Sequence, residues 1–507
     1  MEHPQQRPEP AAEHTTDLSM VDFRAATAQQ WRRSVLSREV SAVELTTTAL
    51  TAAATLNGLG AFLHLDPEFA LARAEQFDST FAALRRSSGD DEAAAQMAVK
   101  APLAGLPTAF KDLVPVAGLP LTMGTLAHPA VIPARDNPLA RRVHRAGAVS
   151  IGKTQVPEFG LPCYSENQLG DPARNPLDPQ RTSGGSTGGG GAAVAAGILP
   201  VAPGNDGGGS VRIPAAACGV VGLKPGRGRM PDDDGSTSVR NLMTSGPIAN
   251  TAADAALLFD VMAGHRFSAA PADETRDGVQ LPIGCAQRRV TAALRDGLGT
   301  LSIGVTTESP FTPDLEIVLA EEAVIALERA ITALADCGHR VQGTDRHSGS
   351  ESFWPQGYHR DFQTLWTSRL AQLDLDDGQL SGLEPLTRYF VELARARPPA
   401  RTEAAISALQ ESSDHAEDIF GPWDLLLTPM LASAAPPIGW FAGLPAEQNY
   451  IEQCRFTPYS SVVNVLGLPA INVPVHTDGA GLSWSVQLVG KHGSEELLLA
   501  LAATMGA

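Results

Sequence analysis

The segment "RTSGGSTGGGGAAVAAG" (residues 181–197) places glycines around two serines and two threonines and then continues as an alanine-rich run. Glycine accepts positive φ angles and lets the backbone approach a ligand or another segment closely, but ordering it costs conformational entropy. So many glycines therefore indicate either a disordered stretch or a tightly specified site. The rest of the sequence decides between the two.

The composition indicates a globular protein with a large core. Of the 507 residues, 43% are hydrophobic and only 19% are charged, which is unlike a disordered chain. The formal net charge of -18 argues against binding to nucleic acid or to an anionic membrane surface, because both need clusters of basic residues. We therefore expect no nucleic-acid or membrane partner, and a monomer or a homodimer.

The five cysteines are widely spaced and include no CxxC pair, so neither a disulfide framework nor a zinc site is indicated. No dinucleotide-binding loop with its acidic partner is visible. We therefore expect no metal and no cofactor. The N-terminus lacks the basic and apolar regions of a signal peptide, and nowhere do about 20 strongly apolar residues follow one another. These features favour a cytoplasmic protein.

The chain reads as an α/β fold in one discontinuous domain. Ser41 and Glu44 form a capping box that predicts a helix stopped by Gly58, and short apolar runs alternate with helix candidates from about residue 100 to 265. A strand at 301–305 is followed by an amphipathic helix over 314–338. We expect residues 1–16 to be a disordered tail, 17–507 to be a single domain, and 346–422 to be a mostly helical segment on the substrate side.

Two motifs match known patterns without the context that those patterns need. "GAVSIGKT" (residues 147–154) satisfies the phosphate-loop expression, but its four central residues are themselves strand-like, and Pro157 follows soon after. "GGSTG" (184–188) satisfies the nucleophile-elbow expression of α/β-hydrolases, but the proline-rich stretch before it reads as a loop, and no downstream histidine has an informative setting. We therefore predict neither nucleotide binding nor a Ser-His-acid triad.

Three segments remain that together carry a recognisable chemistry. They are "GLPTAFKDL" (residues 105–113), the glycine-rich segment around Ser186, and "GNDGGGSVRIPAAACGVVGLKP" (204–225) with Ser210. In wording and spacing they resemble the amidase signature family, and the likeness extends to 147–160, 244–264, 423–429 and 462–475. The 204–225 segment is most similar to the branch of bacterial amidases that includes 6-aminohexanoate cyclic dimer hydrolase. Thr187 and Asn205 depart from the usual family residues.

The resemblance implies a large mixed, twisted β-sheet with helices on both faces, and a catalytic set of Lys111, Ser186 and Ser210. It also implies that Ser186 follows a cis peptide bond, which Gly185 and its neighbouring glycines would admit. Asp206 and Arg212 are expected to brace the nucleophile loop as a buried ion pair. Thr187 is expected to hydrogen-bond within the glycine-rich segment.

Amide hydrolysis needs an activated nucleophile, stabilisation of an oxyanion, and a proton for the leaving amine. With Ser210 as nucleophile, Lys111 can be the base only when neutral, so burial must lower its pKa from about 10.4 towards 7. Asp112 would oppose that shift, so its side chain should point elsewhere. Ser186 can both donate and accept, which suits a proton relay. Consecutive N–H groups of Gly207, Gly208, Gly209 and Ser210 are expected to form the oxyanion hole.

The sequence predicts the substrate less sharply than the chemistry. We expect a small-molecule amide, and cyclic amides, aryl amides, carbamates and esters all stay open. Aromatic and amide side chains outside the motifs are candidates for lining the pocket: Phe159, Tyr164, Asn167, Trp354, Tyr358, Trp366 and Trp440. Two alternatives are a glutaminase like the ammonia-releasing component of the glutamyl-tRNA amidotransferase, which would need a partner protein, and a non-catalytic binding protein on the same fold.

Overall fold

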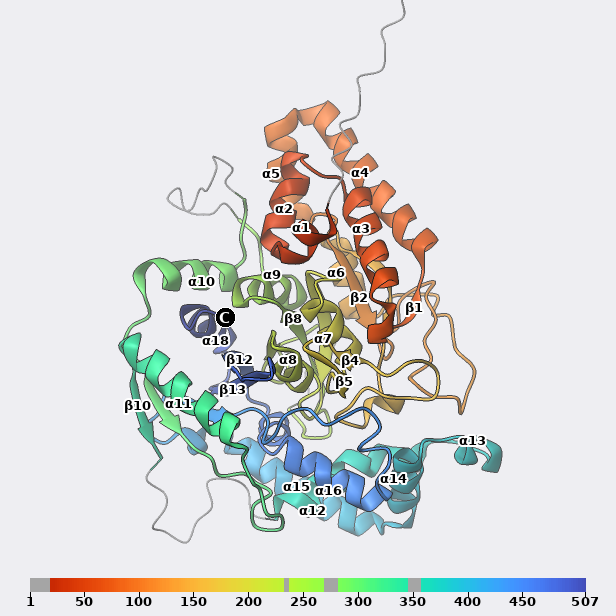
Figure 1. Ribbon diagram of the computed structural model, residues 1–507, viewed down its shortest axis with the longest axis vertical. Coiled ribbons are helices and arrows are strands. Elements are labelled where there is room, and N and C mark those ends of the chain that lie inside the picture. The colour runs from red at the N-terminus through yellow and green to blue at the C-terminus, as the bar shows by residue number, and fades with distance from the viewer. Residues whose placement is uncertain (1–18, 232–236, 269–280, 345–356) are drawn as a thin grey trace, which may run out of the picture.

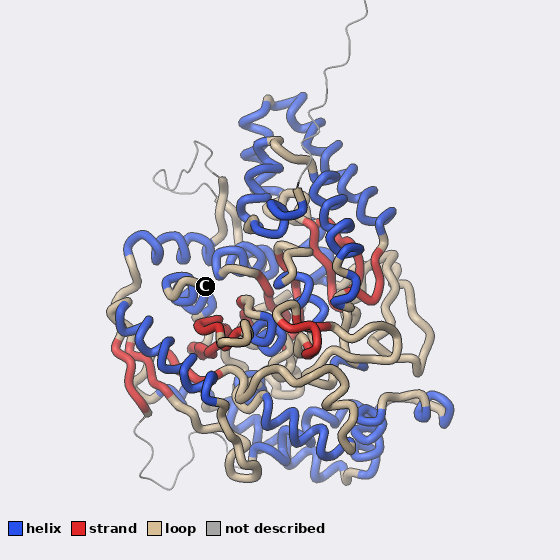
Figure 2. Tube along the Cα trace, in the orientation of Figure 1, coloured by secondary structure: helices blue, strands red, loops and turns tan. Residues whose placement is uncertain are grey.

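The computed structural model describes residues 19–231, 237–268, 281–344 and 357–507. An eight-stranded mixed sheet runs through its centre, with helices on both faces (Figures 1 and 2), as the resemblance implied. The expected tail at 1–16, the candidate Trp354 and the first part of the 346–422 segment lie outside the described residues. Within the described ranges, no helix has the length and apolar character that crossing a membrane requires.

The sheet order is β10-β9-β11-β13-β12-β7-β8-β6. Only the β10/β9 and β9/β11 pairs are parallel; the other pairs are antiparallel. The strand bounds are β6 (Val201–Asp206), β7 (Val221–Lys224), β8 (Thr244–Ala249), β9 (Ser302–Val305), β10 (Arg340–Gly343), β11 (Leu425–Pro429), β12 (Ala470–Thr477) and β13 (Ser483–Gly490).

Alternation along the central strands divides their side chains between two faces. One face packs into the main hydrophobic core, and the other carries polar side chains together with apolar residues of a second hydrophobic cluster, such as Leu426 and Val489. Val486 and Leu488 of β13 join the main hydrophobic core, whereas Gln487 between them points to the other side and accepts a hydrogen bond from Arg212. The helices α9 (Ala252–Ala263), α10 (Cys285–Asp296), α11 (Glu321–Asp336) and α18 (Glu495–Thr504) contribute to that main core. Helices α7 (Gly188–Ala195) and α8 (Arg212–Cys218) pack against each other.

The N-terminal part forms a helical layer over a small three-stranded sheet of order β1-β3-β2, at the top of Figure 1. Its strands are β1 (Phe62–Leu65), β2 (Pro107–Lys111) and β3 (Val149–Thr154). The helices are α1 (Met20–Ala25), α2 (Ala28–Ser37), α3 (Ala42–Thr55), α4 (Pro67–Ser88), α5 (Asp90–Lys100) and α6 (Pro138–Arg145). Ser41 caps α3 through the expected capping box with Glu44.

Neither the phosphate-loop match at 147–154 nor the nucleophile-elbow match at 184–188 has the local structure of the family whose pattern it fits. The residues of "GAVSIGKT" from Val149 onward form the buried strand β3, and Lys153 pairs with Asp112 in the interior at 2.9 Å. The stretch before Ser186 holds a two-stranded ribbon, β4 (Arg174–Asn175) with β5 (Asp178–Thr182), whose residues are mostly not buried. A ribbon of this kind is not the buried strand that a nucleophile elbow requires.

A second helical layer lies below the sheet in Figure 1. It contains α12 (Tyr358–Ser368), α13 (Asp377–Ser381), α14 (Pro385–Ala396), α15 (Pro399–Asp414) and α16 (Ala446–Phe456), together with the short turn η5 (Arg369–Gln372). A second hydrophobic cluster, with Phe362 and Phe390 among its buried residues, holds this layer together. The helix expected over 314–338 starts only at Glu321, because residues 314–320 run as a non-helical connection into the N-cap Ala320.

Candidate active site

Lys111 ends strand β2, and no part of it is exposed to solvent. Its Nζ donates to Ser186 Oγ at 3.0 Å, to Thr187 Oγ1 at 3.1 Å and to the backbone carbonyl of Asn205 at 3.3 Å. All three acceptors are neutral oxygens. These three contacts use all the N–H groups of the protonated amine, and no carboxylate of the described residues contacts it. The neutral amine has two N–H groups and a lone pair, so it can accept a hydrogen bond from the Ser186 hydroxyl instead.

Burial lowers the pKa of Lys111 to about 7, although Asp206 works in the opposite direction. Asp112, the neighbour that could have kept the lysine charged, points away from it as expected. Its Oδ1 accepts from Lys153 and its Oδ2 accepts from the backbone N–H and the hydroxyl of Thr122. A lysine with this pKa is substantially neutral near physiological pH, which a general base requires.

Ser186 lies in the turn between β5 and α7, and the Gly185–Ser186 peptide bond is cis, as the resemblance implied. Gly185 fits here because a Cβ on it would lie 2.7 Å from the backbone nitrogen of Tyr164. On the other side of Ser186, the backbone N–H of Thr187 donates to the carbonyl of Ser210 at 3.1 Å. The two glycine-rich segments are therefore joined directly beside the two serines.

Ser186 and Ser210 face one cavity of about 330 Å³. Ser210 is 8% exposed and also borders a smaller cavity of about 50 Å³, whose lining is mainly apolar and aromatic. The two cavities share Leu161, Ser210 and Trp366. Within the described residues no hydrogen bond joins the two serine hydroxyls.

The backbone around Gly209 commits one of the expected oxyanion donors to another partner. The Gly209 N–H donates to Asp206 Oδ1 at 2.7 Å, so it is not aimed at a substrate oxygen. Gly207 and Ser210 line the larger cavity and Gly208 lines the smaller one. Their three N–H groups are the remaining candidates for an oxyanion hole.

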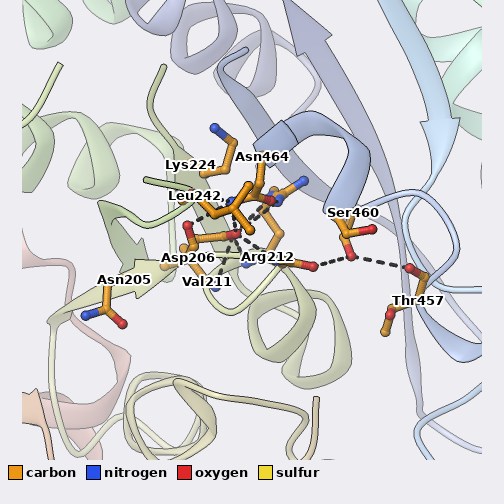
Figure 3. A network of polar contacts seen from close by, with 12 residues as sticks. Asn205, Asp206, Val211, Arg212, Lys224, Leu242, Thr457, Ser460 and Asn464 are labelled. Atoms are coloured by element: carbon orange, nitrogen blue, oxygen red, sulfur yellow. Dashed lines mark hydrogen bonds and ion pairs between the residues drawn. The ribbon is translucent and has the colours of Figure 1, made fainter. Parts of the chain in front are cut away.

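Asp206 and Arg212 form a doubly hydrogen-bonded ion pair, with Nε–Oδ2 and Nη2–Oδ1 distances of 3.0 Å, and neither residue is exposed. Figure 3 shows how the pair is held: Asn464 donates to the Asp206 carboxylate and accepts from the Arg212 guanidinium, while Ser460 binds the carbonyl of Gly208. Burial alone would raise the pKa of Asp206, but the Arg212 guanidinium outweighs it and holds that pKa well below its usual range.

The sequence-derived pocket residues are divided by the structure. Phe159 and Trp366 line the larger cavity. Tyr358 lies one layer behind the smaller cavity, where its hydroxyl donates to Ser461 and its ring stacks on Phe362. This stacking, and a hydroxyl already engaged, keep Tyr358 out of the cavity lining.

Three other candidates lie away from both cavities, which corrects the expectation for them. Tyr164 is buried and stacks on Phe441 at 4.8 Å. Asn167 uses its amide to donate to Gln155 and to the carbonyl of Val156, so it braces a loop. Trp440 is 42% exposed on the surface, and its ring packs edge-on against the buried Phe441.

Several cavity residues carry no sequence motif. Three of them are arginines, Arg227, Arg240 and Arg369, and they come from separate parts of the chain. Asn241 adds an amide group, and Leu161, Leu242, Met243 and Leu365 add apolar surface. Only the folded chain brings these positions together, so no local pattern could have indicated them.

Asp260, His265 and Cys285 form the group of potential metal ligands found among the described residues. The Asp260 carboxylate already accepts hydrogen bonds from the backbone N–H groups of Ala286 and Gln287 in the first turn of α10, and it also contacts His265 Nδ1 at 2.7 Å. None of the three residues lines the cavities at Ser210.

The sequence matches a family model and is similar to named amidases. The family model described as Amidase matches residues 44–499. The chain is 36% identical over 445 residues to "Putative amidase AmiB2" of Mycobacterium tuberculosis, covering 86% of this chain and 90% of that protein. It is 31% identical to a 6-aminohexanoate-cyclic-dimer hydrolase of Pseudomonas sp. (strain NK87), covering 80% of this chain and 83% of that protein.

The fold agrees with solved structures of the same group. The structure of 6-aminohexanoate cyclic dimer hydrolase complexed with substrate matches with a TM-score of 0.78 and 28% identity, covering 96% of this chain and 97% of that chain. A native peptide amidase from Stenotrophomonas maltophilia shares the fold, with a TM-score of 0.71 and 24% identity over 95% of this chain and 96% of that chain. The chain therefore belongs to the amidase family and is an amide-hydrolysing enzyme.

Proposed function

We propose that this protein hydrolyses the C–N bond of a small-molecule amide through an acyl-enzyme on Ser210, with Ser186 as proton relay and Lys111 as general base. The observation that carries the proposal is the buried Lys111 amine, 3.0 Å from Ser186 Oγ and with a pKa of about 7, beside a cavity that Ser210 lines. A cyclic amide fits the proposal because the relatives include a cyclic-dimer hydrolase. Aryl amides, carbamates and esters require the same steps.

The first half-reaction forms the acyl-enzyme. The oxygen of Ser210 attacks the amide carbon, its proton passes to Ser186, and the Ser186 proton passes to the neutral Lys111 amine. The N–H groups of Gly207, Gly208 and Ser210 stabilise the oxyanion, and losing one such donor typically costs about 3 kcal/mol of transition-state stabilisation.

Collapse of the tetrahedral intermediate breaks the C–N bond. The proton on Lys111 returns through Ser186 to the departing nitrogen, which leaves as a neutral amine. Water then attacks the ester on Ser210, using the same base and relay, and releases the carboxylic acid and the free serine. The relay requires Ser210 to donate to Ser186, and catalytic hydrogen bonds often tighten only when substrate is bound.

Labelling with a fluorophosphonate tests the nucleophile. Intact-mass spectrometry should show one adduct on the wild-type chain and none on Ser210→Ala. Ser183→Ala is the control, because Ser183 lies in the neighbouring glycine-rich segment around Ser186, and its hydroxyl has no hydrogen-bond partner within the described residues. An adduct that persists on Ser210→Ala would refute the assignment, and ammonia release from glutamine by the wild type would favour the glutaminase alternative.

A further inference from the structure

The cavity at Ser210 is positively charged although the whole chain is acidic. Its lining includes Arg227, Arg240 and Arg369, and no aspartate or glutamate appears among the described lining residues. The chain as a whole has a formal net charge of -18. A local excess of one charge in a recess attracts ligands of the opposite charge.

Two of the three arginines are engaged with other groups of the protein. Arg227 donates to the carbonyls of Asn464 and Val465 and to Ser413, which ties the loop after β7 to the helical layer. Arg240 pairs with Glu403, with an Nη2–Oε2 distance of 2.6 Å. The Arg240 charge is therefore already balanced by a carboxylate.

Arg369 differs from both. Its Nη2 donates to the backbone carbonyl of Arg240 and to Oδ1 of Asn241, each at 2.8 Å, and both acceptors are neutral. No carboxylate pairs with this guanidinium in the described part of the chain. Because arginine cannot lose its proton in a protein, Arg369 brings to the cavity a permanent positive charge that no carboxylate of the described residues neutralises.

Arg369 lies close in sequence to Trp366, and both residues line the larger cavity. Arg369 begins η5, directly after α12, and three residues before it Trp366 lines the same cavity. Trp366 also borders the small apolar cavity that Ser210 shares, so that cavity suits an uncharged group while the guanidinium borders the larger one. The two hydrogen bonds on Nη2 fix the guanidinium and prepare it to bind a planar, bidentate anion.

We propose that the substrate amide carries a carboxylate and that Arg369 binds it, which makes Arg369 a specificity-determining residue. This inference rests on the proposed hydrolysis at Ser210. A carboxylate fits better than a compact inorganic anion, because its two oxygens match the planar donor edge of a guanidinium. The half of the substrate without the charge then occupies the small apolar cavity.

Matched substrates test the proposal. The kcat/KM for glutaryl-4-nitroanilide, which ends in a carboxylate, is compared with that for hexanoyl-4-nitroanilide, which is neutral and of similar length. A second pair, 4-acetamidobenzoate and acetanilide, places the carboxylate on the leaving amine. Wild-type enzyme should prefer the charged member of at least one pair by roughly tenfold or more, consistent with one charge-assisted contact.

Substitution of the arginine separates recognition from catalysis. Arg369→Gln should lower kcat/KM for the preferred charged substrate roughly 10- to 100-fold, mainly through KM, and leave the neutral substrate within about twofold. Arg388→Gln on α14 is the control, because it removes an exposed arginine of the same helical layer that lines neither cavity. Arg388→Gln should leave kcat/KM unchanged for both the charged and the neutral substrate.

A binding measurement makes the result independent of turnover. Calorimetry with glutarate should show binding to the wild-type protein that weakens at least about tenfold in Arg369→Gln and is unchanged in Arg388→Gln. Equal turnover of charged and neutral substrates, or binding of glutarate that does not depend on Arg369, would overturn the inference while leaving hydrolysis at Ser210 intact. If fluorophosphonate fails to label Ser210 in the wild-type protein, that result would instead count against the proposed function.

Discussion

The amine of Lys111 lies 3.0 Å from the hydroxyl of Ser186, although the two residues are 75 positions apart in the chain. Lys111 is the last residue of strand β2 in the small sheet, and Ser186 follows the cis peptide bond in the turn before α7. Asp112, next to the lysine, is drawn away by its ion pair with Lys153. Lys111, the proposed base, therefore keeps a lowered pKa while it contacts Ser186, the proposed relay.

The hydroxyl of Thr187 holds the same amine from a second side, at 3.1 Å. Thr187→Val keeps the side-chain shape but removes the acceptor, so we expect kcat to fall roughly tenfold through misplacement of the base. Thr187→Ser restores an oxygen at this position and should retain activity within about threefold. Steady-state kinetics with any amide that the wild-type enzyme hydrolyses gives kcat for both variants. Equal kcat values for Thr187→Val and Thr187→Ser would contradict this role of the threonine hydroxyl.

Gly209 has a φ of +128°, and a Cβ on it would lie 2.5 Å from Ile213 and 2.6 Å from Ser460. Gly209→Ala should therefore shift the loop that carries Ser210 and reduce activity at least about 100-fold, the cost of a small misplacement in a catalytic site. Gly228 also has a positive φ but nothing within 4 Å of a Cβ, so Gly228→Ala is the matched control. Fluorophosphonate labelling rates give the comparison, and similar rates for the two variants would refute the packing argument.

Removing the partner of a buried carboxylate should destabilise the fold. Arg212→Gln leaves Asp206 buried without its guanidinium, and breaking such a pair typically costs about 3–5 kcal/mol of unfolding free energy. Urea denaturation at pH 7 measures this loss. Adding Asp206→Asn to the Arg212→Gln variant removes the unpaired charge and should recover part of it; a double variant less stable than the single one would argue against the charge explanation.

The pH dependence of this loss has a definite sign. In the wild-type protein the lowered pKa of Asp206 contributes stability that is present above the unfolded-state pKa and is lost as the pH falls through the folded-state value. In Arg212→Gln, burial instead raises that pKa, so the carboxylate is destabilising when charged. The stability gap between the two proteins should therefore narrow as the pH is lowered towards 4. A gap that widens over this range would be inconsistent with the ion pair as its source.

Substitution by alanine should affect KM at Trp366 but not at Trp440. Trp366 lines both cavities, so Trp366→Ala should raise KM roughly tenfold while Ser210 still reacts with a small fluorophosphonate. Trp440 is 42% exposed and lines neither cavity, so Trp440→Ala should leave KM within about twofold. A larger effect at Trp440 would show that the pocket extends beyond the residues assigned to it.

The sequence predicted the local geometry around the glycine-rich segments better than the lining of the pocket. Lys111, Ser186 and the Asp206–Arg212 pair lie in short patterns whose residue types are tied to one geometry, and the structure brings the members of each pair together. The strand nature of "GAVSIGKT" was also readable, because its centre is β-branched and apolar. Such features depend on neighbours in the sequence.

The pocket depends instead on which distant segments meet. Tyr164 and Tyr358 are aromatic, as pocket residues often are, but their rings stack on Phe441 and Phe362 inside the core. Arg369 has no local signal, because its importance comes from contacts with residues near position 240. The hydrogen bond from Gly209 to Asp206 could not be foreseen either, since it depends on the exact turn of the loop.

The pH dependence of the acylation rate tests the central claim most directly. The rate of fluorophosphonate labelling at Ser210, followed by intact mass from pH 5 to 9, should rise with pH and level off above an apparent pKa near 7, because the lysine must lose its proton to act as base. Lys111→Met should label at least about 100-fold more slowly and without this rise. A rate in Lys111→Met that matches the wild type, or a wild-type profile flat across this range, would contradict a buried neutral lysine as the base.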